Sequence, residues 1–270
     1  MAEIKATTQI TDLLVINKDT LQLLGWPIGQ DSLLRVKVRQ RLSKRIHATN
    51  CQRGYRATWR IENNKLYLES IQEYPEKKND KPVSLKGIFD AYQDEQGKIL
   101  ASWFNATIYA GSGEKLEMYD SGYYLNHEHE TMYDIRKGIV VNKLQYQNFI
   151  KSSSPTKRLS CWNMVRSNFN GDLFPELADK QLIADVSILP NFNGQVRSLE
   201  VIEWKINGKP VPPFAANHPY VKELKRCLDL IPNWGVIFIR GEVRKIRSEV
   251  TLWNKNDAKA FFRKKSVRPL

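Results

Sequence analysis

Short runs of alternating apolar and polar residues fill the first 150 positions and end at Gly, Asn, Asp or Pro. Period-two alternation of β-branched and aromatic residues is typical of half-buried β-strands. The clearest runs are LLRVKVRQRL (33–42), ATWRIE (57–62), KLYLESI (65–71), KILASWFNATIYA (98–110) and KGIVVNK (137–143). Asn63 and Asn64 lie between two of these runs and suit a two-residue hairpin turn. This half is therefore predicted to be a mostly antiparallel sheet.

The second half predicts two strands, a helix and further strands. The expected strands are QLIADVSIL (181–189), VRSLEVIEW (196–204), VIFIRG (236–241) and VRKIRSEVTLW (243–253), with NFNGQ (191–195) as the first turn. The helix is indicated by Asn217 as a candidate N-cap, Pro219 in the first turn, and apolar residues at helical spacing: Val221, Leu224, Leu228 and Ile231. Pro232 then ends it. The fold class predicted for the whole chain is α+β.

Residues 151–158, KSSSPTKR, combine serines and a proline with like charges, which is typical of a linker. We therefore expect a mostly-β domain over 1–150, a linker over 151–158 and an α+β domain over 159–270 with a basic tail. Trp162 follows the linker directly, and it is interpreted as docking the two halves together.

The order of elements in the second half resembles the C-terminal domain of TonB-like proteins over about residues 175–255. The resemblance is carried by ADVSILPNFNGQVRSLEVIE (184–203), PYVKELKRCLDLIPNW (219–234) and EVRKIRSEVTLW (242–253). It includes Gly194 in the turn and the Pro232–Asn233–Trp234 step after the helix. The chain departs from the pattern in the INGKPVPPF insertion (206–214) and in lacking an upstream anchor. The resemblance therefore implies only a β-β-α-β fold and a binding role.

The first half resembles a family of uncharacterised bacterial proteins. The shared residues are Cys51, Gly54, Tyr55, Thr58, Trp59 and Ile61, then Lys65 to Leu68, Ala101, Trp103 and Phe104, and finally Lys137, Gly138, Val140 and Val141. Gln52 stands where that family has Trp. The resemblance implies no activity, and it suggests an immunity-type role only through an association with interbacterial toxins.

Composition favours a protein of a reducing compartment. The three cysteines, Cys51, Cys161 and Cys227, form no metal-type pair, so we expect free thiols and no disulfide framework. The first residues lack the basic and apolar regions of a signal peptide, and no apolar run approaches the roughly 20 residues of a membrane span. The expected location is the cytoplasm, without membrane insertion.

The net charge of +13 (42 minus 29) is concentrated in the second half. Positions 1–150 carry +3 and positions 151–270 carry +10, of which four positive charges belong to Arg263, Lys264, Lys265 and Arg268. On a strand, four basic residues would form a ridge on one face: Arg35, Lys37, Arg39 and Arg41. Arg244 and Arg247 add basic residues to the closing strand. The alternative is a solvated face balanced by acidic residues of a neighbouring strand, such as Glu114, Glu117 and Asp120.

No catalytic constellation is complete in the sequence. His127 and His129 would share a strand face, but a zinc site needs further ligands that the sequence does not supply. Cys51 and His47 form a conceivable nucleophile pair, for which a buried thiol is the alternative. Gly111–Ser112–Gly113 is interpreted as a hairpin turn, because the Lys-Ser/Thr of a phosphate loop is missing. We expect no catalytic residue, cofactor or metal.

These observations predict a non-enzymatic protein-binding module, of the immunity or accessory type, whose partner is another protein with an acidic surface. The contact is expected at the TonB-like sheet edge or at the basic ridge. Nucleic-acid binding through the basic excess is the alternative, although no nucleic-acid motif accompanies it. A hydrolase or nuclease using His127–Glu130 or Cys51 ranks third.

Overall fold

The computed structural model describes residues 9–43, 48–76, 80–120, 124–151 and 155–254. The chain divides into two compact units, unit 1 over Met1–Phe149 and unit 2 over Ile150–Leu270. The predicted α+β class is confirmed: 46% of the residues are in strands and 19% in helices, in one large mixed sheet and two smaller antiparallel sheets. No helix within the described residues is long and apolar enough to cross a membrane.

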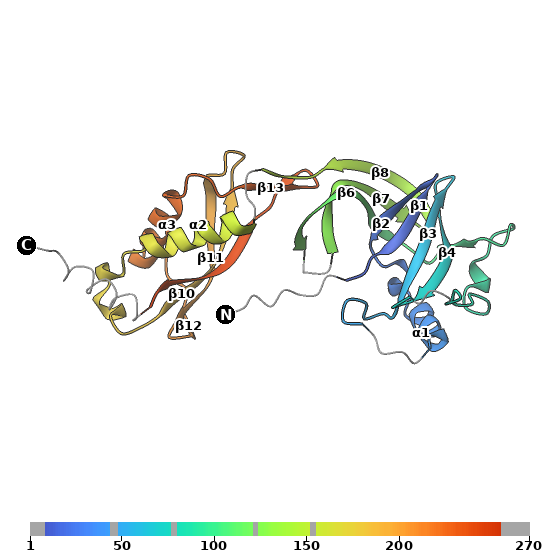
Figure 1. Cartoon of the computed structure of the whole chain (residues 1–270), viewed down its shortest axis with the longest axis horizontal. Helices are drawn as coiled ribbons and strands as arrows, with labels where there is room; N and C mark the ends of the chain where they lie inside the picture. The colour runs from blue at the N-terminus through green and yellow to red at the C-terminus, as the bar shows by residue number, and fades with distance from the viewer. Residues whose placement is uncertain (1–8, 44–47, 77–79, 121–123, 152–154, 255–270) are drawn as a thin grey trace, which may run out of the picture. The chain divides into compact units, whose positions relative to one another are not determined.

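Unit 1 is built on a sheet that closes on itself (Figure 1). Its strands are β1 (Asp12–Ile16), β2 (Asp19–Leu24), β3 (Tyr55–Glu62), β4 (Lys65–Glu73), β5 (Ile99–Leu100), β6 (Ala106–Asp120), β7 (Tyr124–Arg136) and β8 (Ile139–Gln147). They follow the order β3-β1-β2-β6-β7-β8-β4-β5, and β3 also pairs with β4. The β1–β3 pair is parallel, so the sheet is mixed. The core inside this ring includes Leu14, Trp59, Leu66, Phe104 and Ile135, all at most 2% exposed.

Hairpins set by local turns agree with the sequence pattern. Asn63 and Asn64 have φ of 50° and 59°, which is the left-handed conformation of a two-residue hairpin turn between β3 and β4. Lys137 and Gly138 turn β7 into β8 in the same way.

Two predictions for this half, one strand and one turn, are wrong. The run 98–110 is two strands, broken where Phe104 N–H donates to the Ala101 carbonyl (2.9 Å), and Gly111–Gly113 lie inside β6.

Unit 1 also contains helix α1 (Ser32–Arg41) and the short 3-10 helices η1 (Pro27–Gln30) and η2 (Asp90–Tyr92). Helix α1 packs Leu34 and Val38 into the unit 1 core. The predicted strand over 33–42 is therefore wrong, because this segment is a helix that buries Leu34 and Val38 on one side.

Unit 2 packs helices against a four-stranded sheet of order β12-β11-β10-β15. Its elements are α2 (Pro155–Asn168), η3 (Gly171–Leu173), η4 (Pro175–Leu177), β10 (Leu182–Pro190), β11 (Val196–Ile206), β12 (Lys209–Val211), α3 (Pro219–Asp229), β13 (Val236–Ile239), β14 (Glu242–Val243) and β15 (Ile246–Trp253). Strand β9 (Phe149–Lys151), at the boundary of the units, belongs to a small sheet of order β14-β13-β9. Alternate residues of β10, beginning Leu182, Ala184 and Val186, are fully buried in the unit 2 core.

Several expectations for unit 2 need correction. Residues 155–158 of the predicted linker lie in α2 and Lys151 lies in β9, so only 152–154 fall outside the described residues. Trp162 packs in the unit 2 core, with its ring centroid 4.5 Å from that of Trp234. The N-cap of α3 is His218 rather than Asn217, since the His218 Nδ1 accepts the Tyr220 N–H.

Candidate partner-binding site

Four candidate residues lie on helix α1, whose start is fixed by Asp31. The Asp31 carboxylate accepts the N–H groups of Leu33 and Leu34, both at 2.9 Å, which satisfies two donors that a helix start leaves free. Leu34 and Val38, four residues apart, are then buried together, whereas Val36 is 50% exposed. The period-two pattern of Val36 and Val38 concealed this capping signal.

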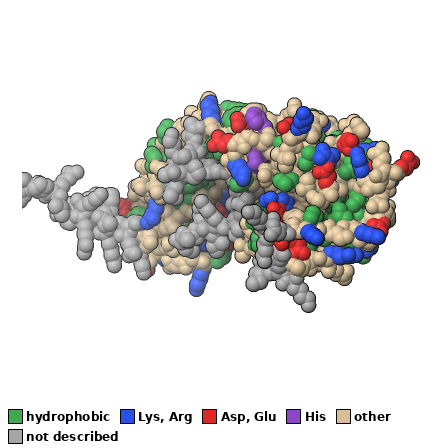
Figure 2. Space-filling view, turned by 45° about the vertical axis from the view of Figure 1, so that its right-hand side comes forward, with side chains coloured by type: hydrophobic (Ala, Val, Ile, Leu, Met, Phe, Trp, Pro, Cys, Tyr) green, Lys and Arg blue, Asp and Glu red, His purple; other side chains and the backbone are tan. Residues whose placement is uncertain are grey.

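The helix separates the four basic side chains that a strand would align. At about 100° per residue, Arg35 and Arg39 lie on one side of α1 and Lys37 on another. Arg41 turns back to donate to the Lys86 carbonyl at 3.3 Å. On the face shown in Figure 2, Lys and Arg side chains are interspersed with Asp and Glu side chains. The expected single ridge is not formed.

The two candidate residues of unit 2 lie near or on strand β15, and both have acidic neighbours. Arg247 donates to both oxygens of Asp185, at 3.1 and 2.6 Å, and this hydrogen bonding raises the pKa of Arg247. Arg244 lies 3.8 Å from Glu242. Two more ion pairs lie on this sheet: Lys205 of β11 with Glu249 of β15 at 2.6 Å, and Lys245, just before β15, with Glu200 of β11 at 2.8 Å. This matches the solvated, balanced face described as the alternative for the basic residues of the first half.

Strand β15 is the last strand of its sheet. It pairs with β10 from Ile246 to Trp253, and no strand within the described residues pairs with its other side. Ile246, Val250 and Leu252 are buried in the core. The strand is therefore held firmly while one row of its backbone N–H and C=O groups faces outward.

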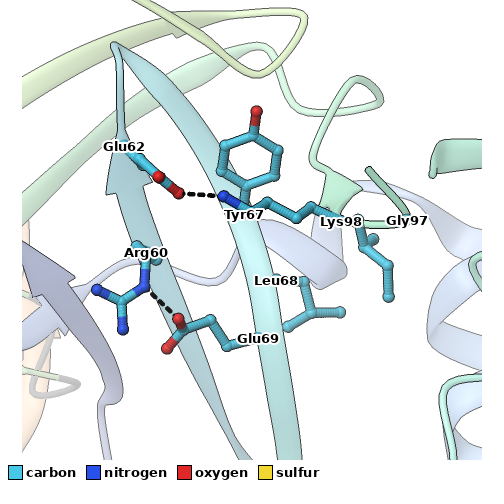
Figure 3. A pocket seen from close by; sticks show the side chains of 8 residues that line it. Arg60, Glu62, Tyr67, Leu68, Glu69, Gly97 and Lys98 are labelled. Atoms are coloured by element: carbon cyan, nitrogen blue, oxygen red, sulfur yellow. Dashed lines mark hydrogen bonds and ion pairs between the residues drawn. The ribbon is translucent and has the colours of Figure 1, made fainter. Parts of the chain in front are cut away.

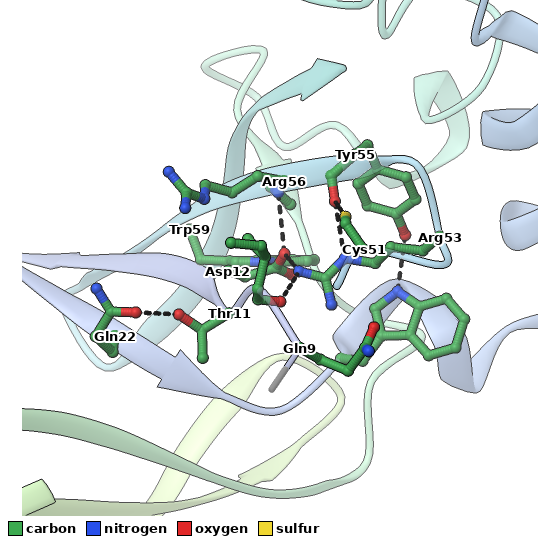
Figure 4. Close-up of polar contacts among 12 residues, drawn as sticks. Gln9, Thr11, Asp12, Gln22, Cys51, Arg53, Tyr55, Arg56 and Trp59 are labelled. Atoms are coloured by element: carbon green, nitrogen blue, oxygen red, sulfur yellow. Dashed lines mark hydrogen bonds and ion pairs between the residues drawn. The ribbon is translucent and has the colours of Figure 1, made fainter. Parts of the chain in front are cut away.

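A buried polar cluster around Asp12 was missed from the sequence (Figure 4). The fully buried Asp12 carboxylate accepts bonds from Arg53 Nη2 (2.7 Å), the Ala57 N–H (3.0 Å) and Trp59 Nε1 (3.1 Å). Arg53 also donates to the carbonyl of Tyr55, at 2.9 Å. Burial raises the pKa of Asp12, although Arg53 acts in the opposite direction.

This cluster gives the motif from Cys51 to Trp59 a structural role, because it ties β1 to its parallel neighbour β3. The Cys51 thiol is 1% exposed and donates to the Tyr55 carbonyl at 3.3 Å. Burial raises the pKa of Cys51, which favours the thiol over the nucleophilic thiolate. His47 lies outside the described residues. All three cysteines are free thiols, as predicted, and all three are buried.

The histidine pair is divided between the interior and the surface. His127 is 4% exposed, whereas the His129 side chain is 53% exposed. Glu130 accepts the His127 N–H and the Asn126 amide, both at 3.0 Å, at a point where the β6–β7 register shifts. Among the described residues no group of three or more His, Cys, Asp or Glu is placed to hold a metal.

A pocket of about 360 Å³ lies beside β3, β4 and the turn before β5 (Figure 3). Its charged lining groups are paired with one another: Arg60 with Glu69, and Lys98 with Glu62 at 2.6 Å. No charged group is left to orient a ligand there, so the pocket carries no functional assignment.

Comparisons with protein-family models, curated proteins and solved structures gave no match. The resemblances to TonB-like domains and to the uncharacterised bacterial family therefore remain expectations.

Proposed function

We propose that the protein is a non-enzymatic protein-binding module whose second half is a TonB C-terminal-like domain. Its contact is the outer edge of β15, where an extended segment of the partner adds a strand. The observation that carries this proposal is the position of the eight-residue β15 at the end of its sheet, with its outer side unpaired among the described strands.

The edge of β15 is suited to strand addition because the strand is already paired with β10 and packed on the core before binding. Its inward side chains, Val250 at 5% and Leu252 at 1% exposure, hold the strand against the core. A partner would therefore order only its own segment, with main-chain hydrogen bonds supplying affinity. The exposed Arg247 and Glu249 alternate with these residues and limit unspecific pairing.

The charge of unit 2 favours an acidic partner. Positions 151–254 carry +5 (15 basic minus 10 acidic), even though ion pairs cover the sheet face, and positions 255–270 carry another +5 (6 minus 1). A positive field of this kind speeds the approach of an acidic protein and adds less to final affinity. An immunity or accessory protein that captures an acidic partner in the cytoplasm fits this chemistry.

The test compares two variants, each with a single substitution to proline, at adjacent positions of β15. In an antiparallel pair, alternate residues bond to the neighbouring strand, so one of Ser248 and Glu249 directs its N–H toward β10 and the other directs it outward. We expect one of Ser248→Pro and Glu249→Pro to keep the wild-type melting temperature. That variant, used as tagged bait in nuclease-treated extract of the native host, should lose the stoichiometric acidic partner that the wild type retains.

Two outcomes would contradict the proposal. Retention of the partner by the stably folded proline variant would exclude the β15 edge. Loss of all bound material on nuclease treatment of the wild type, with affinity falling steeply as salt rises, would favour nucleic-acid binding instead.

A further inference from the structure

A second free edge lies in unit 1, on strand β8 at the outside of the three-stranded arm that it forms with β6 and β7 (Figure 1). Strand β8 meets β4 only at its start, where Lys65 pairs with Ile139 and the Val140 N–H donates to the Asn64 carbonyl at 2.8 Å. Beyond that point β8 continues to Gln147, paired with β7 alone among the described strands.

The hydrogen bonds show which backbone groups of β8 face outward. The Asn148 N–H donates to the Glu128 carbonyl at 2.7 Å, and residues that bond across an antiparallel pair alternate with residues that do not. Tyr146 and Leu144 therefore bond to β7, whereas Lys143, Gln145 and Gln147 direct their N–H groups outward. In agreement, the Lys143 N–H donates to the side chain of Asn142 at 2.9 Å.

The side chains of this edge offer little protection against pairing. Lys143 is the only charged residue among 141–147. Val141 is 56% exposed and Leu144 is 46% exposed, so apolar side chains are exposed along this strand. Soluble proteins normally cover or charge an edge of this length.

We infer that the free edge of β8 pairs antiparallel with β8 of a second copy of this chain. A two-fold axis through Gln145 sets each Leu144 opposite Tyr146 of the other copy, which forms two apolar–aromatic pairs. Each Lys143 then faces Gln147, whose amide donates to the Glu128 carboxylate at 3.4 Å, so each ammonium group gains an acidic neighbour. A register centred on Lys143 would instead oppose two like charges.

The experiment measures mass in solution with the full chain, by sedimentation across a range of concentrations. The wild type should shift from 31.4 kDa toward twice that mass as concentration rises, because a strand pair is a small interface. Gln145→Pro removes an outward N–H without breaking the bonds to β7, so it should stay monomeric with a melting temperature near that of the wild type.

A matched pair of substitutions keeps the test decisive even if proline disturbs the strand. Gln145→Lys places two ammonium groups opposite each other on the axis and should weaken the dimer at least tenfold, whereas Gln145→Thr should leave it intact. A wild type that is monomeric up to millimolar concentration would overturn the inference, and so would a dimer unaffected by Gln145→Lys. Neither result depends on the β15 edge or its partner.

Discussion

The two units differ in how deeply they bury an arginine–aspartate ion pair. In unit 1 the Arg53–Asp12 pair is enclosed, with side chains 9% and 0% exposed. In unit 2 the Arg247–Asp185 pair has the same separation within 0.1 Å, 2.6 Å against 2.7 Å, yet the Arg247 side chain is 63% exposed. Geometry alone would rank the two pairs as equals.

Burial determines how much stability the protein loses when one charge of such a pair is removed. A charge left alone in a protein interior is costly because water cannot replace the lost partner, whereas an exposed charge is solvated and screened. The enclosed pair therefore fixes how β1 and β3 meet, while the exposed pairs on the unit 2 sheet can exchange partners at little cost. The buried Arg53–Asp12 pair therefore stabilises the fold, whereas the exposed pairs of unit 2 leave the surface of the sheet available for binding.

Removing one partner of each pair should produce the largest difference in the free energy of unfolding between the two units. Asp12→Ala leaves Arg53 buried and also removes the acceptor of Trp59 Nε1, so we expect it to lower the free energy of unfolding by about 3–5 kcal/mol. Arg247→Ala should cost at most about 1 kcal/mol. Urea unfolding of both variants measures the contrast, and equal losses would refute the distinction.

The fold was predictable where local residues decide it. The Asn63–Asn64 turn and the β10–β11 hairpin follow from neighbouring positions, and both are found. Long-range pairings are different: no local pattern shows that Leu14 lies beside Trp59 in a parallel pair, or that Asp185 lies beside Arg247, 62 positions away. The arrangement of the basic residues 35–41 was predicted wrongly because a strand-like pattern concealed the Asp31 cap, and the packing of α1 on the core then decided which of its residues are exposed.

Helix α1 provides a second contrast, between inward and outward positions two residues apart. Leu34 is 2% exposed and Val36 is 50% exposed, whereas a strand would bury both. Leu34→Ala should therefore lower the free energy of unfolding by about 2–5 kcal/mol, and Val36→Ala should change it by less than about 0.5 kcal/mol. A substantial loss for Val36→Ala in thermal or urea unfolding would favour the strand.

The smallest expected effect distinguishes the two histidines of β7 through pH. Burial is the main cause that lowers the pKa of His127 below 6.5; Lys115 acts in the same direction, while Glu130 and the Gly113 backbone oppose it. The folded state thus binds protons less readily than the unfolded state. This contribution to stability is complete above pH 6.5 and is lost as the pH falls through the lowered pKa.

We therefore expect the melting temperature to fall between about pH 7 and pH 5, and to fall less in His127→Asn. His129→Gln is the matched control, because the His129 side chain is 53% exposed and its replacement removes no buried imidazole. If His127→Asn retained the full pH dependence, the loss would have to come from other groups. The buried position of His127 would then contribute nothing to the response, and the contrast between the two neighbouring histidines would disappear.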